Sequence, residues 1–280
     1  MRVPDAARSI AIRNKTIGMA SDYHGTVMSS RAKLVRRLFF RAPPVKSCFN
    51  DIVSCKTWII TGTDTGVGKT VLTACLAHVL MKAGANVVAL KPLCSGGRED
   101  VRLLCAATDR RLTLDEINPW HFIAPLAPPI AAKREGRRID RKAVVRFIKE
   151  WQGQADVVLV EGAGGLLSPL GDDFTARDLM SDCKAAPIVV APNRLGAVNQ
   201  VLLVLEALPP RLRRQAQVIL MEPAKPSLAS RTNAGLLGGW MDRSNLHPFP
   251  WLQKGLKSTK WMDAAVTASA LSRLLRMVKG

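Results

Sequence analysis

The sequence predicts a doubly wound α/β fold, in which helices cover both faces of a mostly parallel sheet. Short apolar runs, such as NVVAL at 86–90 and DVVLV at 156–160, alternate with segments of helical periodicity. Strands that are apolar throughout are typical of parallel sheets that are buried on both faces. At 280 residues the chain is also long enough for one large domain of this kind.

The expected elements alternate along the chain in the order that this fold requires. Strands are expected at 57–61, 86–90, 156–160, 187–191 and 217–221, and helices at 70–83, 99–107, 141–151, 198–208 and 263–280. In the helix at 141–151, Val144, Val145, Ile148 and Trp151 share one face at helical spacing. This alternation of strands and helices favours parallel pairing of the strands.

The first 56 residues differ in composition from the rest. They contain eleven Lys and Arg against three Asp and Glu, so one fifth of the chain carries +8 of the formal charge of +19. We expect 1–56 to be a basic, disordered extension and 57–280 to be the folded domain of a cytoplasmic protein. An Arg- and Ser-rich composition also suits a mitochondrial transit peptide, which would place the protein in the matrix, or translated sequence upstream of the true start.

Three classes of site or partner are not expected. The longest apolar runs, 185–193 and 195–205, fall short of the roughly 20 residues that cross a bilayer, so we expect no membrane partner. The six cysteines form no C-x-x-C pair and the four histidines are scattered, which favours free thiols over zinc sites or disulfides. Aromatic residues do not interleave with the basic runs, so we expect no nucleic-acid partner.

The strongest chemical signal is the run GTDTGVGKT, from Gly62 to Thr70, between the first expected strand and the first expected helix. Glycines let consecutive backbone N–H groups point inward at a phosphate, and the following helix adds its positive N-terminal dipole. In such a P-loop, Lys69 reaches the β- and γ-phosphates and the Thr70 hydroxyl binds Mg²⁺. The alternative is a glycine-rich turn with an incidental lysine, but the flanking strand and helix favour an ATP-binding catalytic domain with a P-loop NTPase-like fold.

Three charged residues are candidates to complete the site. Glu161 ends one expected strand and Lys91 follows another, so both belong to the sheet edge where ligands bind. Both carboxylates also have a structural interpretation. Asp100 begins a helix, where a carboxylate interacts favourably with the helix dipole, and Glu161 can be an ordinary acidic residue at the end of a strand. With Thr70, the two carboxylates form a candidate Mg²⁺ site. The convergence of these groups with Lys69 favours a functional site over the structural interpretations.

The motifs follow the order found in dethiobiotin synthetases, which the chain resembles from about Thr57 to about Leu252. The matching runs are GTDTGVGKT, KPLCSGG, INPWHFIAPLAPPIAA, VEGAGGLLSPL, RLGAVNQ and FPWL. Five residues separate Gly62 from Gly68, one more than in the usual P-loop, and this expanded spacing is a property of that family. The resemblance implies an ATP- and Mg²⁺-dependent ligase that forms dethiobiotin from 7,8-diaminononanoate and CO₂, through a carbamate that is phosphorylated before the ring closes.

The resemblance also implies roles for individual residues. Lys69 and Lys91 would be catalytic, and Thr70, Asp100 and Glu161 would hold Mg²⁺. The residues implied in substrate binding are Thr65, Ser95, Gly164, Leu195, Gly196 and Asn199. Those implied in ATP binding are Gly66, Val67, Gly68, Lys69, Thr70, Val71, Asp100, Glu161, Gly162, Ala163, Gly164, Glu222, Pro250, Trp251 and Leu252. Because the segment that begins at Leu195 receives the substrate carboxylate from the partner subunit in this family, a homodimer is implied.

The chain departs from the family pattern at several positions. Glu222 stands where an Asn commonly reads the adenine edge, Arg194 where a Lys is frequent, and Leu166 where an aromatic residue is frequent. A carboxylate accepts hydrogen bonds but cannot donate to the adenine ring nitrogen, so the preference for ATP over other nucleotides is open. The segment 224–246 matches poorly, and no substrate residue is inferred from it.

Three other functions compete with this interpretation. A partition-type P-loop ATPase would bind DNA, but such proteins carry a second lysine near the start of the loop, and the stretch 62–65 has none. A related amide ligase of the cobyrinic-acid synthase kind usually continues into a glutaminase domain, for which we expect no room in this chain. The third is an inactive descendant of the family that only binds nucleotide, an alternative raised by the departure from the family pattern at Glu222.

Overall fold

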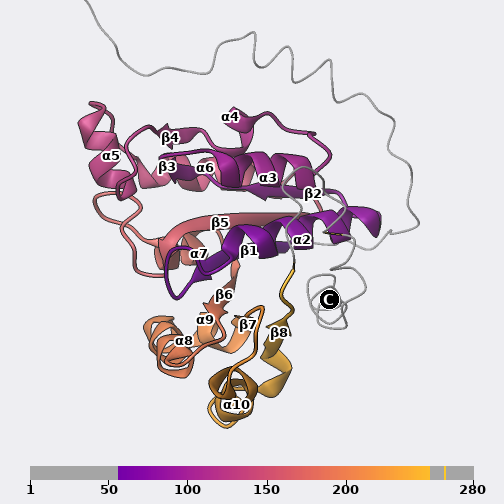
Figure 1. Cartoon of the computed structure of the whole chain (residues 1–280). Helices are drawn as coiled ribbons and strands as arrows, with labels where there is room; N and C mark the ends of the chain where they lie inside the picture. The colour runs from indigo at the N-terminus through magenta and orange to yellow at the C-terminus, as the bar shows by residue number, and fades with distance from the viewer. Residues whose placement is uncertain (1–55, 253–261, 263–280) are drawn as a thin grey trace, which may run out of the picture. The chain divides into compact units, whose positions relative to one another are not determined.

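A six-stranded sheet forms the centre of the fold in the computed structural model, which describes residues 56–252 and Met262 (Figure 1). Its strands pair in parallel in the order β2-β5-β1-β6-β7-β8. They span β1 Lys56–Gly62, β2 Val87–Leu90, β5 Val157–Gly165, β6 Ala186–Pro192, β7 Gln217–Met221 and β8 Leu246–Phe249. A second, two-stranded parallel sheet pairs β3 (Leu93–Ser95) with β4 (Trp120–Phe122).

Helices connect the strands. They are α2 Lys69–Lys82, α3 Glu99–Ala107, α4 Leu114–Ile117, α5 Pro128–Arg134, α6 Arg141–Gln152, α7 Ala176–Asp182, α8 Ala197–Ala207, α9 Pro210–Gln215, α10 Leu228–Leu237 and the 3₁₀ helix Arg243–Asn245. Figure 1 shows α5 beside β3 and β4, which it contacts. Every residue of β2 and all but the first of β1 are buried, so both faces of the sheet are covered. The predicted doubly wound α/β fold is confirmed.

The helix α6 illustrates how the sequence pattern sets the packing. Asp140 caps its N-terminus by accepting hydrogen bonds from the backbone N–H groups of Lys142 and Ala143, and such a cap stabilises a helix by about 1 kcal/mol. The buried residues of α6 are Val144, Ile148 and Trp151, three of the four that the spacing predicts, whereas Val145 is only half-buried. The helix packs against β5, which carries part of the site.

The helix α2 begins without a side-chain cap. Gly68 precedes it with a φ of 102°, in the left-handed region, and no side chain accepts a hydrogen bond from the first turn. The first N–H groups of a helix have no partner within the helix. At α2 they therefore remain available to an anion, which the positive end of the helix dipole attracts.

The structure corrects several sequence predictions. The strand expected at 156–160 continues to Gly165, so Glu161 lies inside β5 rather than at its end. The sequence does not predict β3, β4 and β8, nor the helices α4, α5, α7, α9 and α10. The other four expected strands and four expected helices within the described residues are present, each within one residue at either end.

Some predictions fall outside the described residues. These are the extension up to residue 55, the helix at 263–280 and the cysteines at positions 48 and 55. Within the described part, Cys94, Cys105 and Cys183 are free thiols, and none of its helices is long and apolar enough to span a bilayer. The domain division at residue 56 and the cytoplasmic location stay predictions.

Candidate active site

A cavity of about 830 Å³ lies beside the P-loop. It is lined by thirteen of the site residues predicted from the sequence, namely Thr65, Gly66, Gly68, Lys69, Thr70, Val71, Lys91, Ser95, Asp100, Glu161, Gly162, Ala163 and Gly164. These residues come from stretches far apart in the sequence. The sheet brings them together because β2, β5 and β1 are neighbours and their carboxyl ends meet at one edge.

The P-loop places a buried lysine at the cavity. Lys69, only 6% exposed, donates from Nζ to the carbonyl oxygen of Asp64 at 2.8 Å, so its side chain curls back over the loop. Burial lowers the pKa of Lys69, while the negative charge of Glu161 opposes that shift. Val67, also predicted to bind ATP, is a buried residue of the loop and does not line the cavity.

Lys91 and Glu161 form a buried ion pair at the same cavity. Lys91 Nζ lies 2.6 Å from Glu161 Oε1 and 2.5 Å from Asp100 Oδ2, and the Thr70 hydroxyl donates to Glu161 Oε1 at 2.8 Å. Burial alone lowers the pKa of Lys91, but its two carboxylate partners outweigh it and raise the pKa well above the usual range. Lys91 is therefore an ammonium at neutral pH. Burial raises the pKa of Glu161, which is 1% exposed, and Lys91 opposes that effect.

The oxygen atoms at this cavity fit Mg²⁺. Glu161 Oε2 is buried and has no hydrogen-bond partner in the described residues, so one carboxylate oxygen is available to a cation. The Thr70 hydroxyl bonds the other oxygen, and Asp100, whose side chain is 48% exposed, reaches the same cluster. Mg²⁺ takes oxygen ligands and usually keeps several waters, so one or two carboxylates and a hydroxyl suffice.

Other residues also line the cavity. Ser95 Oγ is buried without a hydrogen-bond partner in the described part of the chain. Ser168, which the sequence reasoning did not assign, accepts a hydrogen bond from the backbone N–H of Gly165 at 2.9 Å and also lines the cavity. Cys94, Gly97, the stretch 125–128 and Pro169 are the remaining lining residues. Their only signal in the sequence is that they lie inside the matching motif runs.

Comparisons with known proteins bear on this site. A family model described as an AAA domain matches residues 56–248. A relative from Nitrosospira multiformis, named ATP-dependent dethiobiotin synthetase, is 40% identical over 169 residues, which cover 59% of this chain and 73% of the relative. A relative of the same name from Bacillus licheniformis is 35% identical over 188 residues, covering 65% and 80%.

The chain belongs to the dethiobiotin synthetase family. Among solved structures, pNOB8 ParA bound to nonspecific DNA is similar with a TM-score of 0.50 at 13% identity, covering 80% of this chain and 99% of that one. At this identity the similarity concerns the fold alone. It agrees with the P-loop NTPase-like architecture of a dethiobiotin synthetase family member.

The residues that the family resemblance assigns to the adenine do not line the cavity. Glu222 follows β7, and its Oε1 accepts a hydrogen bond from Asn193 Nδ2 at 2.8 Å. The preceding residue, Met221, lies against the P-loop, since a Cβ placed on Gly68 would be 2.9 Å from Met221 Cε. Pro250, Trp251 and Leu252 follow β8, which pairs with β7. These family positions therefore lie after the carboxyl ends of two neighbouring strands, β7 and β8, and outside this cavity.

The residues that the family resemblance assigns to the substrate carboxylate lie elsewhere. Leu195, Gly196 and Asn199 are at the start of α8, and all three are exposed. Gly196 has a φ of 87° and no side chain caps the helix. None of the three lines the cavity of its own chain. The structure of this family member thus does not bring them to Lys69 and Lys91.

Proposed function

We propose that the chain is an ATP-dependent dethiobiotin synthetase that closes a ureido ring on 7,8-diaminononanoate with CO₂, giving ADP and phosphate. The observation that carries the proposal is the convergence of two buried lysines, Lys69 and Lys91, with Glu161 at one cavity beside the P-loop. Membership of the dethiobiotin synthetase family supports the choice of substrates.

The proposed reaction forms three bonds in turn. One amine of the substrate attacks CO₂ and loses a proton, which gives a carbamate. A carbamate oxygen then attacks the γ-phosphorus of ATP, and ADP leaves. The second amine attacks the carbonyl carbon and loses a proton, and phosphate departs with its bridging oxygen. Because this last step is intramolecular, holding the substrate in one conformation supplies much of its rate.

The lysines supply positive charge where this reaction develops negative charge. Phosphoryl transfer depends mainly on positioning and on electrostatic stabilisation, and it needs no covalent nucleophile from the protein. Lys69 lies at the end of the P-loop and Lys91 directly after β2. Two ammonium groups at one cavity would therefore stabilise the transferred phosphoryl group from one side and the carbamate from the other.

Thr70, Asp100 and Glu161 would hold Mg²⁺ in this proposal. When bound, the ion shields the charge on the β- and γ-phosphate oxygens of the nucleotide. The unpartnered Glu161 Oε2 and the neighbouring Thr70 hydroxyl support this assignment. Ser95 and Thr65 line the same cavity, where their hydroxyl groups would orient the carbamate.

ADP release with and without 7,8-diaminononanoate and bicarbonate tests the proposal. We expect release that requires both substrates, together with dethiobiotin detected by mass spectrometry in equal amount. ADP release that is independent of the diamine and stimulated by DNA would instead favour a partition-type ATPase. Nucleotide binding without any release would favour a catalytically inactive descendant.

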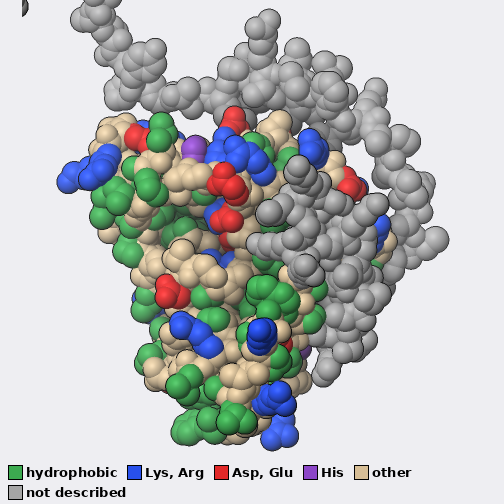
Figure 2. Space-filling view, viewed as in Figure 1, with side chains coloured by type: hydrophobic (Ala, Val, Ile, Leu, Met, Phe, Trp, Pro, Cys, Tyr) green, Lys and Arg blue, Asp and Glu red, His purple; other side chains and the backbone are tan. Residues whose placement is uncertain are grey.

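A homodimer is part of the proposal, with α8 at the interface. Leu203, in the largely apolar helix α8, is 61% exposed, and Leu195, two residues before the helix, is 86% exposed. Hydrophobic side chains gather at the lower end of the view in Figure 2, over α10, which contacts α8. An exposed apolar patch of this kind marks an interaction surface. In a dimer formed there, the start of α8 from one protomer would receive the substrate carboxylate at the site of its partner.

Leu203→Glu is expected to shift the protein from dimer to monomer and to lower kcat/KM for the diamine. The substitution puts a charge into an apolar interface, while the exposed position keeps the monomer fold intact. Sedimentation velocity and steady-state kinetics measure both effects. Ile130→Glu, at a residue on α5 that is 54% exposed, is the control and should leave the mass unchanged. A wild-type monomer would contradict the proposed interface.

Glu222 is expected to relax nucleotide choice, so that GTP and CTP support turnover better than in a Glu222→Asn variant. Asn193 donates to Glu222 Oε1, and the ionised carboxylate offers a nucleotide base only acceptors. One adenine position then lacks its donor, which costs roughly 0.5–1.5 kcal/mol, a few-fold to about tenfold in affinity. The measurement is kcat/KM for ATP, GTP and CTP in both proteins. A strong ATP preference in both would mean that the base is read elsewhere.

A further inference from the structure

We infer that Asn118 is a positioning residue for Lys91, because its buried side-chain amide holds the backbone from which the lysine reaches the site. The inference deepens the proposed function and rests on it. Asn118 is 1% exposed and follows the short helix α4, directly before Pro119. It lies in the run INPWHF, which marks the family resemblance without assigning the asparagine a role.

The main sheet stops supporting the backbone just before Lys91. The last residue of β2 that pairs with β5 is Leu90, opposite Val160, and β3 begins only at Leu93. Lys91 and Pro92 therefore lie between two strands, and neither belongs to a strand ladder. Their backbone needs another source of hydrogen bonds, because both residues are buried.

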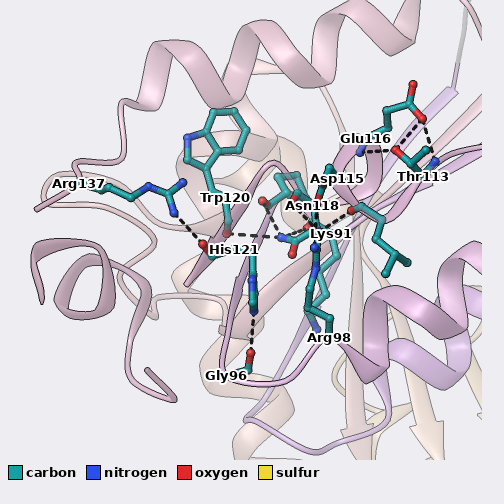
Figure 3. Close-up of polar contacts among 12 residues, drawn as sticks. Lys91, Gly96, Arg98, Thr113, Asp115, Glu116, Asn118, Trp120, His121 and Arg137 are labelled. Carbon is teal, nitrogen blue, oxygen red and sulfur yellow. Dashed lines mark hydrogen bonds and ion pairs between the residues drawn. The ribbon is translucent and has the colours of Figure 1, made fainter. Parts of the chain in front are cut away.

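Asn118 supplies those hydrogen bonds. Its Nδ2 donates to the carbonyl oxygens of Lys91 at 2.9 Å and of Pro92 at 3.1 Å, with a longer contact to that of Trp120 at 3.4 Å (Figure 3). Backbone bonds add to this support, from Lys91 N to Ile117 O and from Trp120 N to Pro92 O, each at 3.1 Å. The segment 117–120 thus fixes the two residues that leave the sheet.

The arrangement requires an amide at position 118. Three carbonyl oxygens surround Nδ2, so the side chain must present N–H donors to them. Its other end, Oδ1, is buried and has no hydrogen-bond partner among the described residues. A buried acceptor without a partner is unfavourable. Position 118 therefore requires the two N–H donors of an amide, even though the amide oxygen is left without a partner among the described residues.

Arg98 makes further hydrogen bonds that hold the backbone of Asn118 and of α4. Arg98 Nη2 donates to the carbonyl oxygens of Leu114 at 2.8 Å and of Asn118 at 3.2 Å (Figure 3). Arg98 lies two residues before Asp100, so both ends of the segment 91–100, which includes β3 and the start of α3, are tied to α4 and the residue after it. The segment carries two groups of the proposed site, Lys91 and Asp100, and its backbone position sets where both side chains lie.

Removal of the amide donors is expected to lower kcat through Lys91. Asn118→Asp changes the volume very little but replaces the two N–H donors with a carboxyl group that offers at most one O–H, so the 91–92 backbone loses most of its side-chain support. A shift of about 1 Å in a catalytic group costs on the order of 100-fold in rate. We therefore expect kcat to fall about 10- to 100-fold, with the KM for ATP changed by less than about threefold because the P-loop is untouched.

A double-mutant cycle separates positioning from a purely structural role. If Asn118 acts through Lys91, the Lys91→Ala, Asn118→Asp double variant is no slower than Lys91→Ala alone. A loss by the same factor in both backgrounds would overturn the inference. Asn118→Ser keeps one hydroxyl donor and should give an intermediate kcat. It provides the same test should the aspartate variant fail to fold.

Two further measurements complete the experiment. Gln217→Glu is a matched amide-to-carboxyl change at a buried residue that bonds His247, at the opposite end of β7 from the site, and it should lower the thermal midpoint without lowering kcat. The NMR signal of the Lys91 ammonium, assigned by its loss in Lys91→Ala, should shift in Asn118→Asp. A shifted signal in an enzyme that makes no dethiobiotin would support positioning while the proposed function fails. An unshifted signal with wild-type kcat would overturn the positioning role itself.

Discussion

Lys69→Ala is expected to lower kcat for dethiobiotin formation by about 10³-fold or more, while the chain stays folded. The ammonium lies at the end of the P-loop, where it would meet negative charge that develops on the transferred phosphoryl group. Its present bond to the Asp64 carbonyl oxygen is to the loop itself, so the side chain serves the loop and the cavity rather than the apolar core. Steady-state kinetics with ATP and the diamine measure the loss.

The fold should tolerate this change. Burial lowers the pKa of Lys69, which means that the folded chain binds this proton less tightly than the unfolded chain does. The positive charge on Lys69 therefore opposes folding at neutral pH, and alanine removes that unfavourable term. The thermal midpoint should stay close to that of the wild type. Lys142→Ala, on the exposed side of α6, is the matched control and should leave both activity and stability unchanged. Wild-type activity in Lys69→Ala would exclude the proposed catalytic role.

The sequence predicts those parts of the fold whose signal is local. The strands β1, β2, β6 and β7 are continuous apolar runs, and such runs predict buried parallel strands within one residue. The strand β8 is missed because its sequence, LHPF, contains a proline and a histidine. Both three-residue strands, β3 and β4, are too short for any periodicity. They depend on pairing with each other between residues that are 27 positions apart, such as Leu93 and Trp120, which no local pattern contains.

The candidate site likewise contains some residues that a local sequence pattern predicts and others that only the fold brings into place. Lys69, Thr70 and Lys91 are predicted because a charged or hydroxyl side chain stands at a strand end or in a glycine-rich loop. Asn118 is not predicted, because an asparagine before a proline reads as an ordinary turn residue. Its role becomes visible only when the fold places it against the carbonyl groups that follow β2. Glu222 and its hydrogen-bond partner Asn193 are 29 residues apart in the sequence, so no local pattern predicts their contact either.

Glu161→Gln is expected to lower kcat by about 10²- to 10³-fold and to raise the Mg²⁺ concentration needed for half-maximal rate. The change keeps the shape of the side chain but removes its negative charge. Glu161 is 1% exposed and accepts hydrogen bonds from Thr70 and Lys91, so part of the effect falls on stability. Burial raises the pKa of Glu161, so removing its charge relieves one unfavourable effect, but it also leaves the buried Lys91 ammonium with one carboxylate partner fewer. Because the loss of these charge-assisted bonds is the larger effect, the free energy of unfolding should fall by about 1–3 kcal/mol. Kinetics over a Mg²⁺ titration and urea unfolding measure the two effects separately.

Asp100→Asn separates the metal role of the carboxylates from their structural role. The Asp100 side chain is 48% exposed, so losing its charge should change stability far less than the loss at Glu161. Both variants should nevertheless need more Mg²⁺, because each removes one charged oxygen donor from the proposed site. Asp172→Asn, at a surface carboxylate that is 63% exposed, is the control and should leave kcat and the Mg²⁺ requirement unchanged. If neither Glu161→Gln nor Asp100→Asn raises the Mg²⁺ requirement, the ion is held elsewhere and Glu161 acts only as the partner of Lys91.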